Sequence, residues 1–170
     1  VIQQIVGRHN RVVNLSNPIV DTRLADGSRV NIVLAPVSLD GSTITIRNFP
    51  EKPLDMQTLI QKGALPEDAA EFLKMLVRAK YNLLISGGTS SGKTTFLNAL
   101  SQYIPEDERV ITIEDSAELQ IQGIKNLVRL ETRNANMEGV QPVTIRDLIR
   151  TALRMRPDII LVGEFRGAEA

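Results

Sequence analysis

The sequence predicts an α/β fold built on a parallel sheet and preceded by a smaller α+β unit. Beyond residue 81, short apolar runs alternate with amphipathic segments of helical period, a pattern typical of parallel strands joined by crossover helices. Before residue 48, the apolar residues recur with a period of two on either side of an Asp-Gly turn. The length of 170 residues suits one domain and a fraction of another.

The first part of the chain predicts a short antiparallel sheet against a helix. Apolar residues within Val1–Val6 have helical spacing. Two alternating runs, Ile19–Leu24 and Val30–Leu34, flank Asp26-Gly27, a strong hairpin signal because the favoured turns need positive φ. A third alternating run covers Thr43–Arg47.

A boundary follows this unit. The stretch Asn48–Pro53 carries two prolines and no periodicity, which is typical of a linker. We therefore assign residues 1–50 to part of an N-terminal α+β domain and 51–57 to a linker. Residues 58–170 are assigned to the first portion of a second domain.

Helices and strands then alternate. Asp55 is a plausible N-cap for a short helix that ends at Gly63. Pro66, at the first position, opens a helix to about Lys80 with acids in its first turn and bases in its last, as the helix dipole favours. The remaining expected elements are strands at Leu83–Ser86, Val110–Glu114, Leu127–Leu130 and Asp158–Val162, and helices at Lys93–Tyr103 and from Thr144 through Leu153.

A glycine-rich segment carries the clearest chemistry. Residues 87–94 fit G-x-x-x-x-G-K-[ST] between a predicted strand and a predicted helix, the context that a nucleotide phosphate loop requires. Inward-pointing backbone N–H groups and the helix N-terminus would hold phosphates, and Lys93 would reach the β- and γ-phosphates. Thr94 would bind Mg²⁺ and Thr95 the α-phosphate. The competing interpretation is a glycine-rich turn without a ligand. The nucleotide-binding set is Gly87, Gly88, Thr89, Ser90, Ser91, Gly92, Lys93, Thr94 and Thr95.

Acidic residues follow two predicted strands. Glu114-Asp115 ends one and Gly163-Glu164 ends another, and ligands gather at the carboxyl ends of parallel strands. We assign Glu164 to Mg²⁺ and its water shell, and Glu114 to the general base that activates water. The alternative is that Glu114 and Asp115 only cap a surface loop. A GTPase is not indicated, because the sequence lacks Asn-Lys-x-Asp.

Four linked motifs carry a family resemblance. They are the phosphate loop, the acidic stretch Ile113–Leu119, the run Val128–Arg133, and Leu153–Asp158 leading into Val162–Gly167. In this order and spacing they resemble the type II/type IV secretion ATPase superfamily, and most of all the Tad (Flp) pilus assembly ATPases of the CpaF kind. The resemblance implies a P-loop NTPase (RecA-like) sheet, which the chain would leave incomplete at its C-terminus, so we expect a longer parent protein.

The resemblance also implies an ATP-hydrolysing motor that powers pilus assembly or protein secretion. Such a motor would use ATP and Mg²⁺, form a homohexamer and engage an inner-membrane platform protein, which places it in the cytoplasm, peripheral to the inner membrane. Arginines would reach the phosphates; the catalytic candidates are Arg47 and Arg133, with Arg29 and Arg129 as further positions. Arg166 falls in the family's Gly-Glu-x-Arg motif, whereas the family's histidine box is absent and His9 cannot replace it.

Composition limits the other functions. Twenty basic and twenty acidic residues give zero net charge, which disfavours sequence-independent binding to nucleic acid. Apolar runs reach four residues, against about 20 for a membrane-spanning helix, and the absence of cysteine excludes zinc ribbons and disulfides. Two alternatives to the motor stay open: a nucleotide-binding but non-hydrolysing fragment, and a nucleic-acid translocase of related fold.

Overall fold

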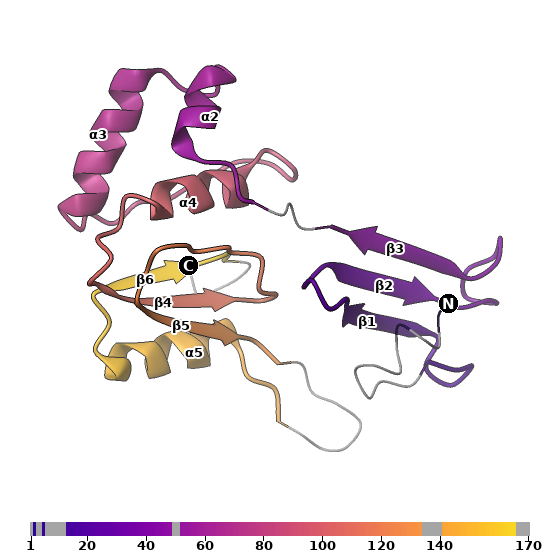
Figure 1. Cartoon of the computed structure of the whole chain (residues 1–170). Helices are drawn as coiled ribbons and strands as arrows, with labels where there is room; N and C mark the ends of the chain where they lie inside the picture. Colours follow the sequence, from indigo (N-terminus) through magenta and orange to yellow (C-terminus); the bar gives the residue numbers. More distant parts are fainter. Residues whose placement is uncertain (1, 3–4, 6–12, 49–51, 134–140, 166–170) are drawn as a thin grey trace. The chain divides into compact units, whose positions relative to one another are not determined.

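The chain divides into two compact units, Val1–Glu51 and Lys52–Ala170 (Figure 1). The structure is a computed structural model, and it describes residues 2, 5, 13–48, 52–133 and 141–165. Each unit has its own sheet in these described residues.

The first unit holds an antiparallel sheet in the order β1-β2-β3. Its strands are β1 (Ile19–Arg23), β2 (Arg29–Val33) and β3 (Thr43–Arg47), so the predicted hairpin and third strand are confirmed. The β1–β2 turn contains Gly27, at φ 88°, a conformation that glycine adopts without strain. Asp26 fixes the turn because its Oδ1 accepts the backbone N–H of Ser28 at 2.9 Å.

One face of this sheet forms the core of the first unit. Val20, Val30 and Ile32 lie on the same face of β1 and β2 and are buried together with Val13. Of the helix predicted over Val1–Val6, only Ile2 and Ile5 lie within the described residues, and both pack against this core. On the opposite face, Asn31 donates to Asp21 at 3.0 Å.

The second unit is built on a parallel sheet in the order β5-β4-β6. The strands are β4 (Arg109–Glu114), β5 (Asn126–Glu131) and β6 (Ile159–Val162), and each lies within a residue of its predicted position. An α/β fold with a parallel sheet is therefore confirmed. Because β4 pairs with both neighbours, its residues are the most deeply buried of the three strands.

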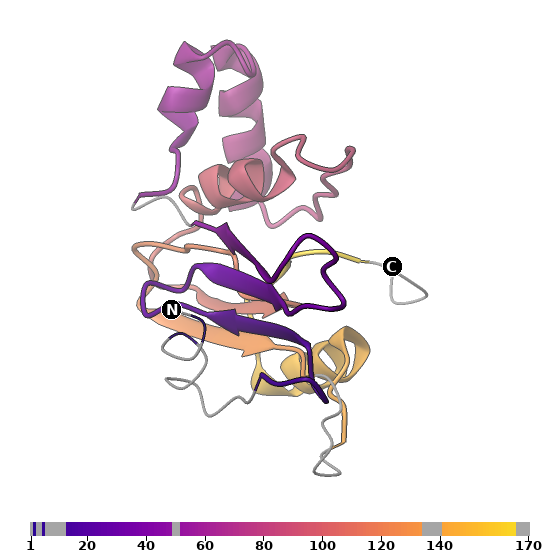
Figure 2. The same ribbon diagram turned by 90° about the vertical axis from the view of Figure 1, so that its right-hand side faces the viewer.

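Helices cover both faces of this sheet, as Figures 1 and 2 show for α4 and α5. On one face, Val110 of β4 and Leu161 of β6 belong to the cluster formed with helices α2 (Met56–Gln61), α3 (Glu67–Arg78) and α4 (Lys93–Ser101). On the other face, Ile111 and Ile113 pack against α5 (Ile145–Ala152), which the 3₁₀ turn η1 (Leu153–Met155) extends. Alternate residues of β4 thus serve different layers.

Local capping signals set the helix starts. Asp55 caps α2 by accepting the N–H of Thr58 at 2.7 Å, as predicted. Thr144 and Asp147 form a reciprocal capping box at the start of α5. Pro66 differs from the expectation: it is the N-cap of α3, with extended ψ of 160°, and Glu67 is the first helical residue.

One predicted element is absent from the described residues. Leu83–Ser86 was expected to be a buried strand, but no strand is assigned there and the Leu84 side chain is 84% exposed. A strand is held by hydrogen bonds to a neighbour, and within the described ranges no strand pairs with this segment. A run of three apolar residues is too short to fix its structure by itself.

Candidate functional site

The glycine-rich segment forms a loop that leads directly into α4. Gly92 is the N-cap of α4 with φ at 92°, in the left-handed region that favours glycine. A Cβ at Gly87 would lie 2.7 Å from Ser91 Oγ, so a side chain there would require the Ser91 hydroxyl to move. The glycine at position 92 is therefore explained by the conformation of the loop itself.

Lys93 lies over this loop. Its Nζ donates to the carbonyl oxygens of Gly87 at 2.9 Å and of Gly88 at 2.7 Å. Residues 87–92 are exposed, whereas Thr94 and Thr95 in the first turn of α4 are half-buried. The loop thus presents a cation and the N-terminal N–H groups of a nine-residue helix at one exposed place, an arrangement suited to an anion such as a phosphate group.

Glu114, at the end of the central strand, is a buried carboxylate with 2% exposure. Its Oε1 accepts the backbone N–H groups of Glu118 and Leu119, both at 2.7 Å, while Oε2 has no hydrogen-bond partner among the described residues. Burial raises the pKa of Glu114. The two backbone hydrogen bonds and the charge of Arg129 act in the opposite direction, and the charge of Glu118 adds to the rise in pKa.

The position of Glu114 follows from strand alternation. It shares a face of β4 with Val110 and Thr112, which is the face covered by α4. Next to it, just beyond the end of β6, a Cβ at Gly163 would lie 3.1 Å from Glu114 Cγ. The sheet therefore places Glu114 on the same side as the helix that follows the glycine-rich loop.

Asp115 contacts the neighbouring strand. Thr132 Oγ1 donates to Asp115 Oδ1 at 2.7 Å and to its carbonyl oxygen at 3.1 Å, and Thr132 N–H donates to the carbonyl of Glu114 at 3.0 Å. For Asp115 this geometry agrees with the alternative expectation of a structural, loop-capping role. Glu114 also holds a turn, but burial of its second oxygen is not explained by that role.

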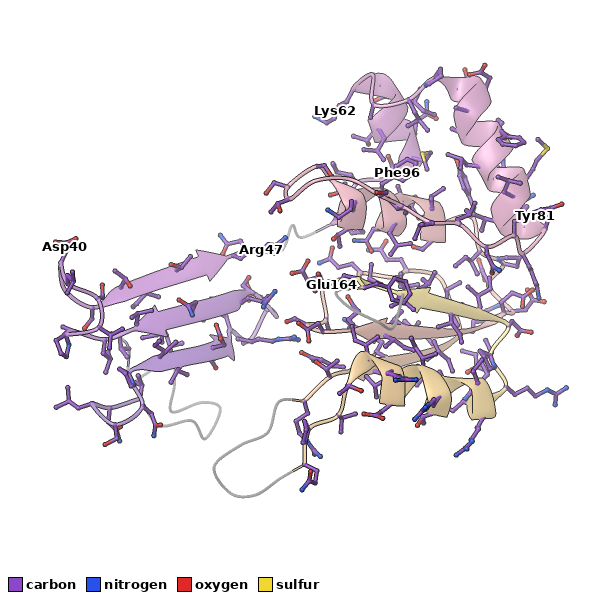
Figure 3. All side chains as sticks on the ribbon, turned by 180° about the vertical axis from the view of Figure 1, so that it is seen from behind. Asp40, Arg47, Lys62, Tyr81, Phe96 and Glu164 are labelled. Atoms are coloured by element: carbon purple, nitrogen blue, oxygen red, sulfur yellow. The ribbon has the colours of Figure 1, made fainter. Side chains whose placement is uncertain are left out.

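Glu164 lies just beyond the end of β6 and is exposed (Figure 3). The residues before it are half-buried, because β6 is an edge strand of the described sheet. Within the described ranges no group of three or more His, Cys, Asp or Glu side chains could hold a metal ion. Glu164 and Thr94 do offer the oxygen donors that Mg²⁺ prefers when phosphates complete its coordination.

Arg47 and Arg29 belong to a row of three arginines across the first sheet, and Arg23 is the third. In register across the first sheet, Arg23 pairs with Arg29 and Arg29 pairs with Arg47. Arg47 lies at the end of β3 (Figure 3). The period-two pattern of the hairpin could have revealed Arg23.

The other arginines have different surroundings. Arg129 Nη2 donates to the carbonyl of Leu119 at 3.2 Å and its charge acts on Glu114. Arg133 Nη2 donates to the carbonyl of Gln141 at 3.2 Å. No contact between Arg133 and Glu114 is found among the described residues. Arg166 and His9 lie outside the described residues.

Among the helices of the described ranges, none has the length and apolarity needed to cross a bilayer.

These observations define an α/β protein with a glycine-rich loop leading into a helix and a buried carboxylate at the end of a parallel strand. A family model described as "Type II/IV secretion system protein" matches residues 2–170. The chain therefore belongs to the type II/IV secretion system protein family.

Individual relatives agree with this membership. The chain is 46% identical over 176 residues to an uncharacterized protein of Methanocaldococcus jannaschii, covering 100% of this chain and 24% of the archaeal protein. It is 36% identical over 174 residues to the type IV secretion system protein PtlH of Bordetella pertussis, covering 90% and 51% of the two chains. The chain thus spans between a quarter and about half of these relatives.

A solved structure is also similar. The VirB11 ATPase from the Brucella suis type IV secretion system, in complex with sulphate, matches with a TM-score of 0.53 and 30% identity. The match covers 97% of this chain and 55% of the VirB11 chain. The likeness extends over both units of the chain, because the matched share leaves few residues out.

Proposed function

We propose that this chain is the nucleotide-binding part of an ATP-hydrolysing motor that powers pilus assembly or protein secretion at the inner membrane. The observation that carries the proposal is the exposed glycine-rich loop with Lys93 over it, on the same side of the sheet as the buried Glu114. Within the family, we propose a P-loop NTPase (RecA-like) of the Tad (Flp) pilus assembly kind.

Nucleotide binding is assigned to the loop. Backbone N–H groups of residues 87–92 and the helix N-terminus would surround the phosphates, and the Lys93 ammonium would neutralise them. Thr94 and Glu164 would hold Mg²⁺, which neutralises phosphate charge when bound. One chain feature supports this fit: both proposed ligands are oxygen donors.

Hydrolysis requires a group that accepts a proton from water. We assign this role to Glu114, because burial raises the pKa of its carboxyl and leaves Oε2 without a hydrogen-bond partner in the described residues. Hydrogen bonds from Glu118 and Leu119 fix Oε1 and so orient the carboxylate. Arg47, with Arg29 of the same row, and Arg133 are the proposed sources of positive charge toward the phosphates, since guanidinium groups match phosphate oxygens.

The organisation follows the same proposal. Residues 1–50 would be part of an N-terminal domain, 51–57 a linker and 58–170 the first portion of the ATPase domain. The full-length protein would be a homohexamer in the cytoplasm, peripheral to the inner membrane, and would act on a platform protein there. No nucleic acid partner is proposed, since the net charge is zero.

Lys93→Ala tests the proposal. In the full-length protein we expect ATP binding and phosphate release both to be lost, while Lys125→Ala, at an exposed surface ion pair with Glu106, should change neither. Binding without phosphate release in the unsubstituted protein would support the non-hydrolysing alternative. ATPase activity that rises with DNA would support the translocase. Full activity of Lys93→Ala would overturn the phosphate-loop assignment.

A further inference from the structure

Three successive backbone N–H groups after β4 are held by two side chains from different elements. The N–H groups of Glu118 and Leu119 donate to Glu114 Oε1, each at 2.7 Å. The next N–H, from Gln120, donates to Oδ1 of Asn98 at 2.9 Å. Residues 118–120 therefore form a short backbone segment, here called the bracket. It is hydrogen-bonded to Glu114 of β4 at one end and to Asn98 of α4 at the other.

Asn98 belongs to the helix that begins at Lys93, the residue lying over the glycine-rich loop. It is buried, with 8% exposure, and a buried amide keeps its place by making its hydrogen bonds. Asn98 lies five positions after Lys93, which is about 7.5 Å along a rigid helix. If the loop and α4 shift together, Asn98 therefore shifts by nearly the same distance.

A third element, β5, also contacts the bracket. Arg129 of β5 donates to the carbonyl of Leu119 at 3.2 Å, and Leu119 itself is 1% exposed. A backbone segment fixed at three consecutive residues moves as a unit. A shift of α4 through Asn98 would therefore carry the two N–H groups that orient the Glu114 carboxylate.

We propose that Asn98 is a positioning residue: it connects the helix that follows the glycine-rich loop to Glu114 through the backbone of residues 118–120. Through these hydrogen bonds, a movement of the loop would change the orientation of the Glu114 carboxylate. The inference deepens the proposed function and rests on it for the role of Glu114 in hydrolysis. The connection itself is a property of this chain.

The first test measures the connection without any nucleotide chemistry. In the 170-residue chain, Asn98→Ala should speed amide hydrogen exchange at residues 118–120 by about fivefold, as expected when one hydrogen bond is lost from a local opening. Asn98→Asp retains an acceptor oxygen and should restore most of this protection. Ser101→Ala is the matched control, because Ser101 is a buried residue of the same helix and its hydroxyl bonds to the carbonyl of Asn98.

The second test measures turnover in the full-length protein. Asn98→Ala should lower kcat for ATP by about tenfold and change KM by less than about twofold, because the loop residues that bind phosphate are untouched. Asn98→Asp should recover part of kcat. Ser101→Ala should leave both kinetic constants near those of the unsubstituted protein.

Two results would overturn the inference. One is unchanged exchange at residues 118–120 in Asn98→Ala relative to Ser101→Ala. The other is an equal fall in kcat for Asn98→Ala and Ser101→Ala, since that would indicate general loosening of α4. A full-length protein that never releases phosphate would count against the proposed function instead, and the exchange experiment would still decide whether Asn98 positions the bracket.

Discussion

Gly163 lies against the side chain of Glu114, so closely that a Cβ at position 163 would come within 3.1 Å of Glu114 Cγ. The contact joins the residue after β6 to the last residue of β4, the two strands being paired in parallel up to Ile113 and Val162. The absence of a side chain at Gly163 is therefore a condition for the observed position of the buried carboxylate.

This contact predicts the effect of Gly163→Ala. Carbon atoms normally pack at about 3.5–4.0 Å, so an added methyl group would displace the Glu114 side chain. We expect ATP turnover in the full-length protein to fall about tenfold, which corresponds to about 1.4 kcal/mol, while nucleotide affinity stays the same.

A double-mutant cycle supplies the control for Gly163→Ala. In a Glu114→Gln background the same change should cause little further loss, because its effect acts through Glu114. Additive losses in the double variant would contradict this explanation and point to a separate role for Gly163.

Glu114 also predicts a pH dependence of stability. Burial raises its pKa in the folded chain above the ordinary 4.5, so the protonated form favours folding. This contribution is complete below the ordinary pKa and is lost as the pH rises through the folded pKa. Gln at position 114 cannot ionise and keeps an oxygen for the two backbone N–H groups.

The measurement is the free energy of unfolding of Glu114→Gln minus that of the unsubstituted chain, by denaturant titration at several pH values. We expect this difference to increase as the pH rises from below 4.5 toward 8. A difference that is constant with pH, or that falls, would show that Glu114 carries no ionisation penalty in the folded chain.

The arginine row makes a prediction about charge geometry. Arg47→Ala in the full-length protein should lower ATP turnover by at least about tenfold, and Arg47→Lys should rescue little, because an ammonium lacks the planar fork that matches phosphate oxygens. Arg146→Ala changes an exposed arginine of α5 and serves as the control. Equal turnover of the Arg47 and Arg146 variants would remove Arg47 from the proposed site.

The capping box of α5 predicts a purely structural effect. Thr144→Ala removes the hydroxyl that accepts the N–H of Asp147 and donates to its carboxylate, and should cost about 1 kcal/mol of unfolding free energy. Thr151→Ala, at an exposed position inside the same helix, should change stability by less than about 0.5 kcal/mol. Thermal or denaturant unfolding of the chain compares the two.

Much of the fold could be predicted because its signals are local. The Asp26-Gly27 turn and the Asp55 cap each depend on a few neighbouring residues, and each is found where expected. Leu83–Ser86 was wrong for the opposite reason. Whether a short apolar run becomes a strand depends on a partner elsewhere in the chain, and its own sequence does not contain that information.

The site was predictable only in its motifs. Glu114 and the glycine-rich loop stand out as sequence patterns, whereas the contact of Gly163 with Glu114 and the bond from Gln120 to Asn98 join residues far apart in the chain. Arg23 was missed although the register of the hairpin contains it. The roles of Glu164 and the arginines in hydrolysis remain predictions.

Successive side chains of β4 point to opposite faces of the sheet, so the two faces of this strand have different surroundings. Ile111 and Ile113 face α5 and pack in an apolar cluster, whereas Thr112 and Glu114 face α4 and carry polar atoms that are buried. We expect substitutions at the first pair to be limited by side-chain volume, and substitutions at the second pair by side-chain chemistry. Homologous chains should therefore exchange aliphatic residues freely on one side of this strand and hold their residues fixed on the other, with a period of two.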